Sequence, residues 1–299
     1  MKYMPEGNLR HYLSKKNKEL SLRDKLSQLL NISRGLKDLH QKNLVHRDFH
    51  SGNILKGIEK TSCLITDLGL CKPANETKKE DKIFGVMPYV APEVLNSKPY
   101  TQASDIYSFG IVAYEIFSGL PPYYNREHGL SLGLDICKGL RPQFQIKIPL
   151  LLENLIKRCW DNNQQNRPTA NKLERILRGW QEEIKERSDY YYRLEAEDTE
   201  FKKQLQAAEE HNKALPDSIK FPDYQKKMHT GAVYHSMLLP TKEITQLLKN
   251  SQVISKQFYK SQELYGSAEM SFSEFLNFTK SKQIIVDEST GLTKRIRQL

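Results

Sequence analysis

Three short polar motifs follow one another in a fixed order within the first third of this chain. The first runs from His46 to Asn53 (HRDFHSGN), the second is Asp67-Leu68-Gly69, and the third is Ala91-Pro92-Glu93. Carboxylate and amide oxygens, such as those of Asp48, Asn53 and Asp67, are the hard ligands that Mg²⁺ prefers. One His-Arg-Asp alone is common by chance. Three motifs in register predict a single site to which all of them contribute.

With these motifs the chain resembles the eukaryotic protein kinases over residues 1–180. The segment 1–9 (MKYMPEGNL) resembles the hinge between the two kinase lobes, and 104–110 (SDIYSFG) resembles the start of the buried central helix. The stretches 159–161 (CWD) and 166–169 (NRPT) point to the tyrosine-kinase-like and tyrosine-kinase branches. The resemblance implies a mainly α-helical large lobe, with short β elements around the catalytic loop.

The resemblance also implies a role for each matching residue. Asp48 would be the catalytic base, Arg47 would couple it to the activation segment, and His50 would lie beside it. The reaction implied is transfer of the ATP γ-phosphate to a protein hydroxyl, most simply that of serine or threonine. Asn53 and Asp67 would be the Mg²⁺ ligands and, through the metal, part of the ATP site. The other implied ATP contacts are Lys2, Met4 and Leu55, at the adenine. Four residues would support the structure of the lobe: His46, Glu93, Asp105 and Arg167.

Three positions depart from the family pattern. His50 replaces the lysine that usually touches the transferred phosphate, and Val86 replaces the threonine hydroxyl that usually bonds the base and that lysine. Both members of one interacting pair are therefore changed together, which leaves a tyrosine acceptor open. The frame of residues 85–93 (GVMPYVAPE) still resembles that of a serine/threonine kinase, so a serine or threonine acceptor is expected. Leu68 replaces a phenylalanine, and we expect it to pack beneath His46.

Kinases carry a glycine-rich loop, a phosphate-pairing lysine and a glutamate before the hinge, and no G-x-G-x-x-G occurs in this sequence. Two interpretations follow. The chain is a truncated product of an incomplete gene model that begins at an internal methionine, or it is a real product whose lobe serves as a catalytically inactive interaction or scaffold module. Because the loop and the lysine position the phosphates, we expect little phosphotransfer from the chain as written.

Apolar periodicity predicts a helix over residues 21–42, which begins at the capping-box-like pair Ser21 and Asp24. Further helices are expected at 105–118, 130–138, 150–160 and 170–180, and a short strand at 63–66. The activation segment would run from Asp67 to Glu93. Its one hydroxyl residue between 72 and 82 is Thr77, a candidate phosphosite that could pair with Arg47; an unmodified loop threonine is the alternative.

Beyond the kinase-like part we expect two further regions. Residues 181–215 are rich in Glu, Lys and Gln and carry apolar residues at near-heptad spacing, which favours a single charged, solvated helix; a coiled-coil-like extension is the alternative. This C-terminal helix is also a candidate site for a partner. Residues 216–299 show no sustained period, and we expect a largely disordered tail.

Composition limits the remaining possibilities. The formal charge of +10 lies wholly within residues 1–180, yet the basic residues are scattered and no specific nucleic-acid motif accompanies them. No apolar stretch is long enough for a membrane span, and the N-terminus lacks a secretory pattern. The four cysteines show no C-x-x-C spacing, which favours a reducing compartment, cytoplasmic or nuclear, and excludes a secreted disulfide framework. ATP and a protein substrate are the expected partners.

Overall fold

The computed structural model describes residues 4–76, 82–185 and 199–251. The chain divides into two compact units, residues 1–245 and 246–299. In the second unit the described residues 246–251 are helical and bond locally. The Gln246 side-chain Nε2 donates to Asn250 Oδ1 at 3.0 Å, and the Ser251 hydroxyl donates to the Leu248 carbonyl at 2.8 Å. All the following structure belongs to the first unit.

Helices dominate the first unit, which confirms the mainly α-helical fold expected from the sequence. The helices are α1 (Leu9–Lys16), α2 (Leu22–Gln41), α3 (Pro92–Leu95), α4 (Gln102–Ser118), α5 (Leu130–Cys137), α6 (Leu150–Cys159), α7 (Ala170–Ile184), α8 (Glu200–Ala214) and α9 (Asp217–Lys220). The short strands are β1 (Leu44–Val45), β2 (Ile54–Lys56), β3 (Cys63–Ile65), β4 (Lys72–Pro73), β5 (Phe84–Gly85) and β6 (Met237–Leu238). No helix in the described part of the chain is long and apolar enough to cross a membrane.

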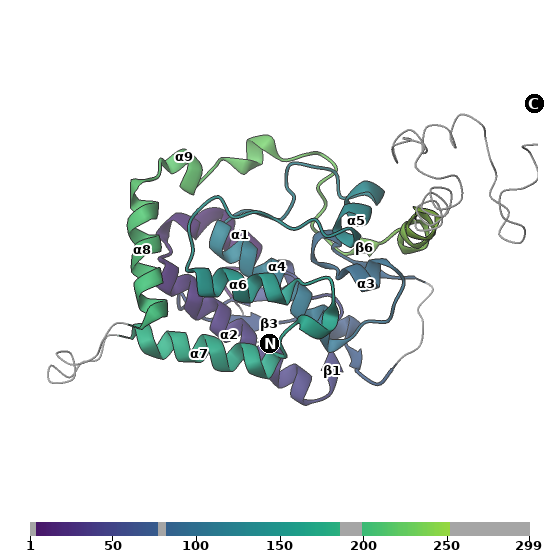
Figure 1. The fold of residues 1–299 in the computed structure, drawn as a ribbon, viewed down its shortest axis with the longest axis horizontal. Helices are drawn as coiled ribbons and strands as arrows, with labels where there is room; N and C mark the ends of the chain where they lie inside the picture. The colour runs from purple at the N-terminus through teal and green to yellow at the C-terminus, as the bar shows by residue number, and fades with distance from the viewer. Residues whose placement is uncertain (1–3, 77–81, 186–198, 252–299) are drawn as a thin grey trace, which may run out of the picture. The chain divides into compact units, whose positions relative to one another are not determined.

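The core is a layer of helices in which α2 packs on α7 and α4, and α4 also packs on α6 (Figure 1). Helix α2 starts where its sequence predicts, because the Ser21 hydroxyl accepts from the Asp24 amide and the Asp24 carboxylate accepts from the Ser21 amide. Every residue of α4 from Ser104 to Ser118 is buried. A helix enclosed on all sides shows no polar face, and α4 is therefore the central helix of the lobe.

Among the residues that the structure describes, three two-stranded antiparallel sheets position the loops of the site. Strand β1 pairs with β4, and β2 pairs with β3 in a register that sets Ile54 opposite Ile65. The third sheet joins β5, which lies just before the third sequence motif, to β6, which lies far along the chain.

Helix α8 is packed against the lobe on one side, which differs from the solvated helix favoured by its composition. The rings of Trp180 on α7 and Phe201 on α8 stack with centroids 4.4 Å apart, and Phe201, Leu205 and Ala208 are buried. Glu, Lys and Gln fill the rest of the helix surface, so the average composition hides a narrow apolar face. Residues 186–198 lie outside the described residues.

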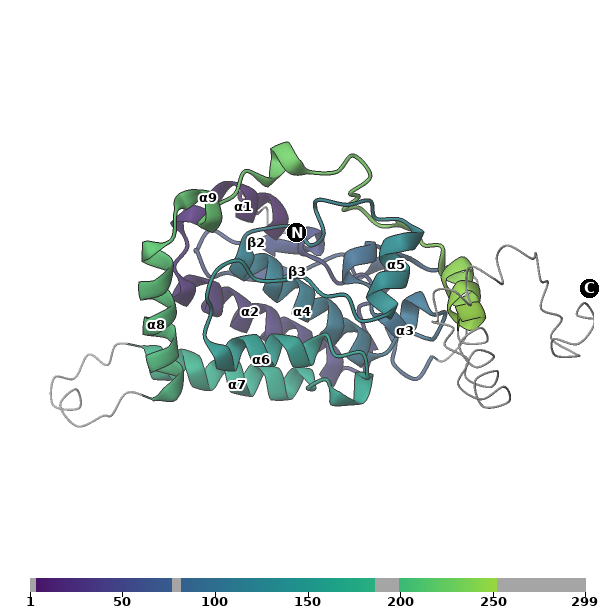
Figure 2. The ribbon, with the colours of Figure 1, turned by 45° about the horizontal axis from the view of Figure 1, so that its top comes forward.

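Residues 216–245 differ from the disordered tail expected there. Helix α9 and strand β6 form within this segment, Leu239 and Ile244 are buried, and the His229 amide donates to the Tyr124 carbonyl at 2.8 Å. Figure 2 shows the segment running beside the connection between α4 and α5. Its order comes from single anchoring contacts and backbone hydrogen bonds, which leave no periodic pattern in the sequence. Residues 252–299 lie outside the described part.

Candidate active site

The catalytic loop between β1 and β2 is held by one buried carboxylate on α4. Asp105 accepts hydrogen bonds from the backbone amides of His46 (2.8 Å) and Arg47 (3.0 Å). The His40 Nε2 lies 3.0 Å from the same carboxylate. Arg47 has a φ of 73°, a conformation that costs energy for a residue with a side chain and needs such support. Asp105 therefore fixes the direction in which the next residue, Asp48, leaves the loop.

Asp48 is buried, with a relative exposure of 7%, yet only one of its carboxylate oxygens is satisfied. Oδ2 lies 3.4 Å from Asn53 Nδ2 and 3.6 Å from His50 Nε2. Oδ1 has no hydrogen-bond partner among the described residues. Buried carboxylate oxygens are normally bonded, so this one is an acceptor that suits a hydroxyl donor from another molecule.

Asn53 is oriented by the loop that it closes. Its Nδ2 donates to the Asp48 carbonyl at 2.9 Å, which leaves the side-chain Oδ1 as an acceptor for another group. Thr66 bonds the Asn53 carbonyl through both its amide (2.9 Å) and its hydroxyl (3.1 Å). Because Asp67 directly follows Thr66, the β2–β3 pairing brings Asn53 and Asp67 to the same end of this sheet. Asp67 takes the left-handed conformation (φ 56°, ψ 68°) there.

His50 stands where the family has a lysine, and its two ring nitrogens have different tasks. Nδ1 accepts from the Gly52 amide at 3.0 Å, so a neutral ring carries its proton on Nε2, the atom nearest the Asp48 carboxylate. Val86, the second departure from the family, is 1% exposed and lines a small cavity together with Asp48 and His50. An apolar side chain thus fills the space of the missing threonine hydroxyl.

A buried network beneath the catalytic loop was not predicted from the sequence. The Tyr89 hydroxyl donates to Glu115 Oε2 at 2.6 Å, and Arg10 Nη2 donates to the Tyr89 hydroxyl at 3.4 Å. The same hydroxyl lies 3.3 Å from the Ser51 hydroxyl of the catalytic loop. Burial raises the pKa of Tyr89, and the Glu115 carboxylate adds to this effect, so the phenol stays a donor. The available signal was Glu115 itself, a carboxylate in the apolar second half of α4 (FGIVAYEIF, residues 109–117), where a buried charge needs a partner.

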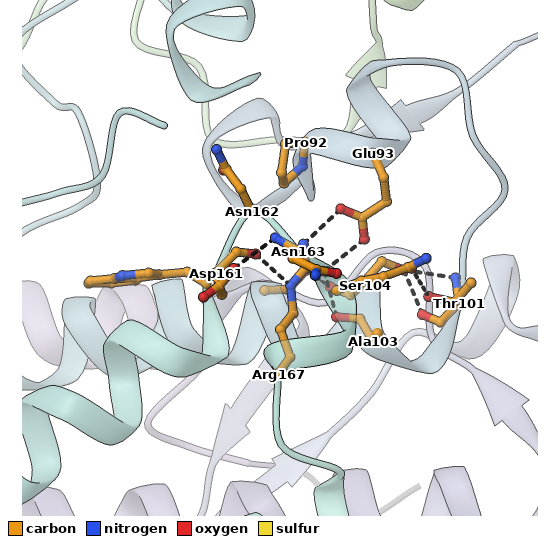
Figure 3. Close-up of polar contacts among 12 residues, drawn as sticks. Pro92, Glu93, Thr101, Ala103, Ser104, Asp161, Asn162, Asn163 and Arg167 are labelled. Atoms are coloured by element: carbon orange, nitrogen blue, oxygen red, sulfur yellow. Dashed lines mark hydrogen bonds and ion pairs between the residues drawn. The ribbon is translucent and has the colours of Figure 1, made fainter. Parts of the chain in front are cut away.

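The expected ion pair between Glu93 and Arg167 is present as a bidentate contact (Figure 3). Arg167 Nη1 and Nη2 lie 2.7 and 2.8 Å from the two Glu93 oxygens. The guanidinium also donates to the carbonyls of Ala103 and Asp161, both at 2.9 Å. Four of its five N–H donors are used, and this bonding offsets the cost of burying the charge. This pair ties the end of the activation segment to α4 and to the loop before α7.

The expected adenine contacts are described in part. Lys2 lies outside the described residues, whereas Met4 and Leu55 are half-buried. The chain after Met4 is tied to β2, because Asn8 forms a β-bridge with Leu55 and the Lys56 amide donates to the Gly7 carbonyl at 2.8 Å. Leu55 is therefore placed beside the segment that resembles the hinge.

Two expectations around the second and third motifs have other outcomes. Leu68 is 52% exposed and does not pack beneath His46; that ring instead meets Phe49 edge-on at 5.5 Å, and its Nε2 lies 3.0 Å from the Thr66 carbonyl. Thr77 lies outside the described residues.

Within the described ranges no three His, Cys, Asp or Glu side chains gather as a metal cage. Asn53 and Asp67 form a smaller oxygen donor set, which fits Mg²⁺ that takes its other ligands from phosphate and water.

Comparison with known proteins agrees with this geometry. The family model described as protein tyrosine and serine/threonine kinase matches residues 1–177. The serine/threonine/tyrosine-protein kinase HT1 of Arabidopsis thaliana is 34% identical over 185 residues, which are 62% of this chain and 47% of that protein. The dual specificity protein kinase zakA of Dictyostelium discoideum is 35% identical over 184 residues, 56% of this chain and 23% of that protein. The RGS domain-containing serine/threonine-protein kinase A of the same organism is 31% identical over 175 residues, 58% and 15% respectively.

The chain belongs to the protein tyrosine and serine/threonine kinase family. It spans about half the length of the Arabidopsis relative and less of the two Dictyostelium relatives. What the family match and the fold share is the large lobe, with its catalytic loop, activation segment and central helix α4.

Proposed function

We propose that this chain provides the catalytic large lobe of a protein kinase that transfers the γ-phosphate of ATP to a serine or threonine hydroxyl. The observation that carries the proposal is the buried Asp48 oxygen without a partner, held in place by Asp105 and flanked by Asn53. A carboxylate kept in this state is suited to accept a hydrogen bond from an attacking hydroxyl. The four cysteines are free thiols, which fits a reducing compartment, the cytoplasm or the nucleus.

The residues present fit ATP and Mg²⁺. When bound, the metal neutralises phosphate charge, and Asn53 Oδ1 and the Asp67 carboxylate would be its protein ligands. Met4, Lys2 and Leu55 would contact the adenine. Asp48 would orient the acceptor hydroxyl and take its proton. His50 is turned toward Asp48 and offers an imidazole where the family has a lysine ammonium, so we expect weaker stabilisation of the transferring charge and a slow kinase.

The packing of α8 limits which surface of this helix a partner could contact. Its apolar face, formed by Phe201, Leu205 and Ala208, is already covered by the lobe. A partner at α8 would therefore meet the charged face of the helix. The alternative function is a scaffold that binds partners and transfers no phosphate. Such a scaffold would bind through the surface of the lobe and would not need Asp48.

Phosphate transfer by the chain, joined to the small lobe of a related kinase, tests the proposed function. We expect incorporation of γ-labelled phosphate into a generic acceptor protein and about a hundredfold or greater loss in Asp48→Asn, since that is the size of a general-base contribution. Asp67→Asn should lose nucleotide-dependent stabilisation by Mg²⁺-ATP as well, because of these two aspartates only Asp67 would touch the metal. Asp217→Asn, a change at an exposed carboxylate, is the matched control.

Phosphoamino-acid analysis of the product distinguishes serine and threonine from tyrosine. Phosphotyrosine as the main product would overturn the acceptor class. A fusion that melts cooperatively and is stabilised by Mg²⁺-ATP, yet transfers no phosphate, would overturn the catalytic role and leave the scaffold function.

A further inference from the structure

A segment far along the chain lies against the activation segment. We call residues 234–239 (YHSMLL) the strap. Its strand β6 pairs antiparallel with β5, with Met237 opposite Gly85 and Leu238 opposite Phe84. The Leu239 amide extends the pairing by donating to the Ile83 carbonyl at 2.8 Å. The strap thus adds a strand to the backbone edge of β5, which is the way that extended peptides dock on sheet edges.

The other end of the strap is anchored beside the catalytic loop. The Tyr234 carbonyl accepts a hydrogen bond from Arg10 Nη1 at 2.5 Å. The Arg10 guanidinium also lies over the Tyr234 ring, with 4.9 Å between Cζ and the ring centroid. The ring of His128 meets the Tyr234 ring edge-on at 4.8 Å, and the Tyr234 hydroxyl donates to the Pro122 carbonyl at 2.9 Å. The ring, the hydroxyl and the carbonyl of Tyr234 are therefore all bound, and this residue anchors the strap.

Each anchor meets a segment that contributes to the proposed site. Arg10 reaches the catalytic loop itself, since a Cβ added to Gly52 would lie 3.4 Å from Arg10 Nη1. At the other end Gly85 precedes Val86, and Val86 lines the same small cavity as Asp48. The residues between the two anchors are His235 and Ser236, and both are exposed. An extended chain advances about 3.3 Å per residue, so Ser236 lies one step from the residue paired with Gly85.

We propose that the strap occupies the binding site of the acceptor peptide, with Ser236 at the position of the acceptor hydroxyl. The strap then describes the kind of substrate that the site takes. This is an extended segment with an aromatic residue two positions before the serine and apolar residues at the three positions after it, as Tyr234, Met237, Leu238 and Leu239 are placed. This inference rests on the function proposed above and adds the substrate class and an internal acceptor.

The chemical step at Ser236 is the proposed reaction carried out within one molecule. Ser236 Oγ forms a bond to the γ-phosphorus of ATP while the bond from that phosphorus to the β,γ-bridging oxygen breaks. ADP leaves with that electron pair, and the hydroxyl proton passes to the Asp48 carboxylate. Because donor and acceptor share one chain, the rate is independent of protein concentration.

The occupancy of the site is tested by peptide binding, which needs no phosphate transfer. A fluorescein-labelled peptide of residues 232–241 is titrated into the full chain in the Asp48→Asn background and followed by fluorescence anisotropy. The double variant Tyr234→Ala/Leu239→Ser removes both anchors of the strap and leaves the surface beneath it unchanged. We expect this variant to bind the peptide at least about tenfold more tightly than the parent, because a tethered competitor acts at high effective concentration.

Leu247→Ser, a change at an exposed leucine beyond the strap, is the matched control and should bind as the parent does. Tyr234→Phe, which keeps the ring on Arg10, should stay close to the parent and guards against a variant that fails to fold. Equal peptide affinity in the parent and in a double variant that still melts cooperatively would overturn the occupancy, whatever the kinase activity proves to be.

The acceptor position is tested by mass spectrometry on the chain joined to a related small lobe after incubation with Mg²⁺-ATP. We expect phosphate on Ser236 at a rate independent of dilution, and none on the exposed Ser218. Phosphate on a generic acceptor protein with none on Ser236 would overturn the acceptor position while the proposed function stands. A third result combines the two experiments: no protein is phosphorylated, yet the Tyr234→Ala/Leu239→Ser variant still binds the peptide more tightly than the parent. The proposed function then fails and Ser236 is not an acceptor, and the strap is only a segment bound at this surface.

Discussion

One buried carboxylate, Asp105, determines the backbone of the catalytic loop. It serves two amides and a histidine at once, and it is 1% exposed. An asparagine at this position keeps the shape but turns an NH₂ group toward one of these donors. A buried donor facing a donor loses its hydrogen bond and adds repulsion, so the loop rather than the core should be the first structure to fail.

We predict that Asp105→Asn lowers the free energy of unfolding by about 2–4 kcal/mol, since hydrogen bonds to a buried charge are lost. Urea unfolding followed by circular dichroism measures the change. Asp135→Asn is the control, because Asp135 is 40% exposed in its pair with Arg126 and should cost less than about 1 kcal/mol. A loss no greater than that of the control would show that the amides of His46 and Arg47 find other partners.

Lys25 carries the opposite risk, a buried charge with little compensation. Its Nζ donates to the Phe117 carbonyl at 3.1 Å, and burial lowers the pKa of Lys25 from 10.5 to about 8. The unfolded chain therefore binds the proton more readily between pH 8 and 10.5, and this group makes stability rise with pH across that interval. Below pH 8 the folded state bears the full cost of the buried ammonium, on the order of 3 kcal/mol.

We predict that Lys25→Met stabilises the protein by about 2 kcal/mol at pH 7, because the desolvation cost outweighs the lost hydrogen bond of about 1 kcal/mol. The advantage over the parent should shrink as the pH rises from 8 toward 10.5. Thermal melts of both proteins across this range, with Lys15→Met at an exposed position as the control, measure the difference. A constant difference at every pH would mean that the Lys25 ammonium is not the cause.

At the scale of elements, a stacked aromatic pair helps to hold α8 to the lobe. Phe201 is 1% exposed and its ring lies nearly parallel to that of Trp180, with an interplanar angle of 2°. We predict that Phe201→Ala lowers the free energy of unfolding by about 3–5 kcal/mol, or detaches α8 alone, since it leaves a cavity under the helix. Hydrogen exchange distinguishes the two results by the protection of α8 against that of α4. Gln206→Ala on the exposed face should change neither.

The elements differ in how far their sequence predicts them. Helix α2 was predicted to within a residue at each end, because Ser21 and a leucine stripe are local signals. The apolar spacing of Phe201, Leu205 and Ala208 was visible, but its partner Trp180 was not, since that contact joins two helices across residues 186–198. Strand β6 could not be predicted: two residues carry no period, and its pairing depends on the backbone of β5.

The same distinction applies to the site. Asp48, Asn53 and Asp67 are named by short motifs because their spacing along one loop and one pair of strands determines their arrangement. Arg10, Tyr89 and Glu115 come from three separate elements, and only the folded chain brings them together. Leu68 shows the limit of a short motif. Leucine is a conservative replacement for phenylalanine, yet the sequence alone does not show which residues surround the side chain, and Leu68 is exposed rather than packed beneath His46.

At the scale of the whole molecule, the first unit combines a closed helical core with an open apolar surface. Leu64 on β3 is 52% exposed, and Leu68 and Leu70 in the turn that follows are 52% and 40% exposed. Leu64 pairs in register with Leu55, the residue expected beneath the adenine, so the exposed leucines begin beside the proposed ATP site. Exposed leucines grouped within one short stretch favour association, whereas scattered ones do not.

We predict that the chain, produced by itself, self-associates at micromolar concentration and binds the dye ANS, and that Leu64→Lys/Leu68→Lys reduces both. Charged side chains at these positions remove the apolar contact without touching the core, because both positions already face solvent. Leu150→Lys, at a 57% exposed position on α6, is the matched control and should leave association unchanged. Sedimentation velocity measures the distribution of species. A parent chain that is monomeric would contradict the predicted self-association. A Leu150→Lys variant that dissociates equally well would show that net charge rather than this surface governs association.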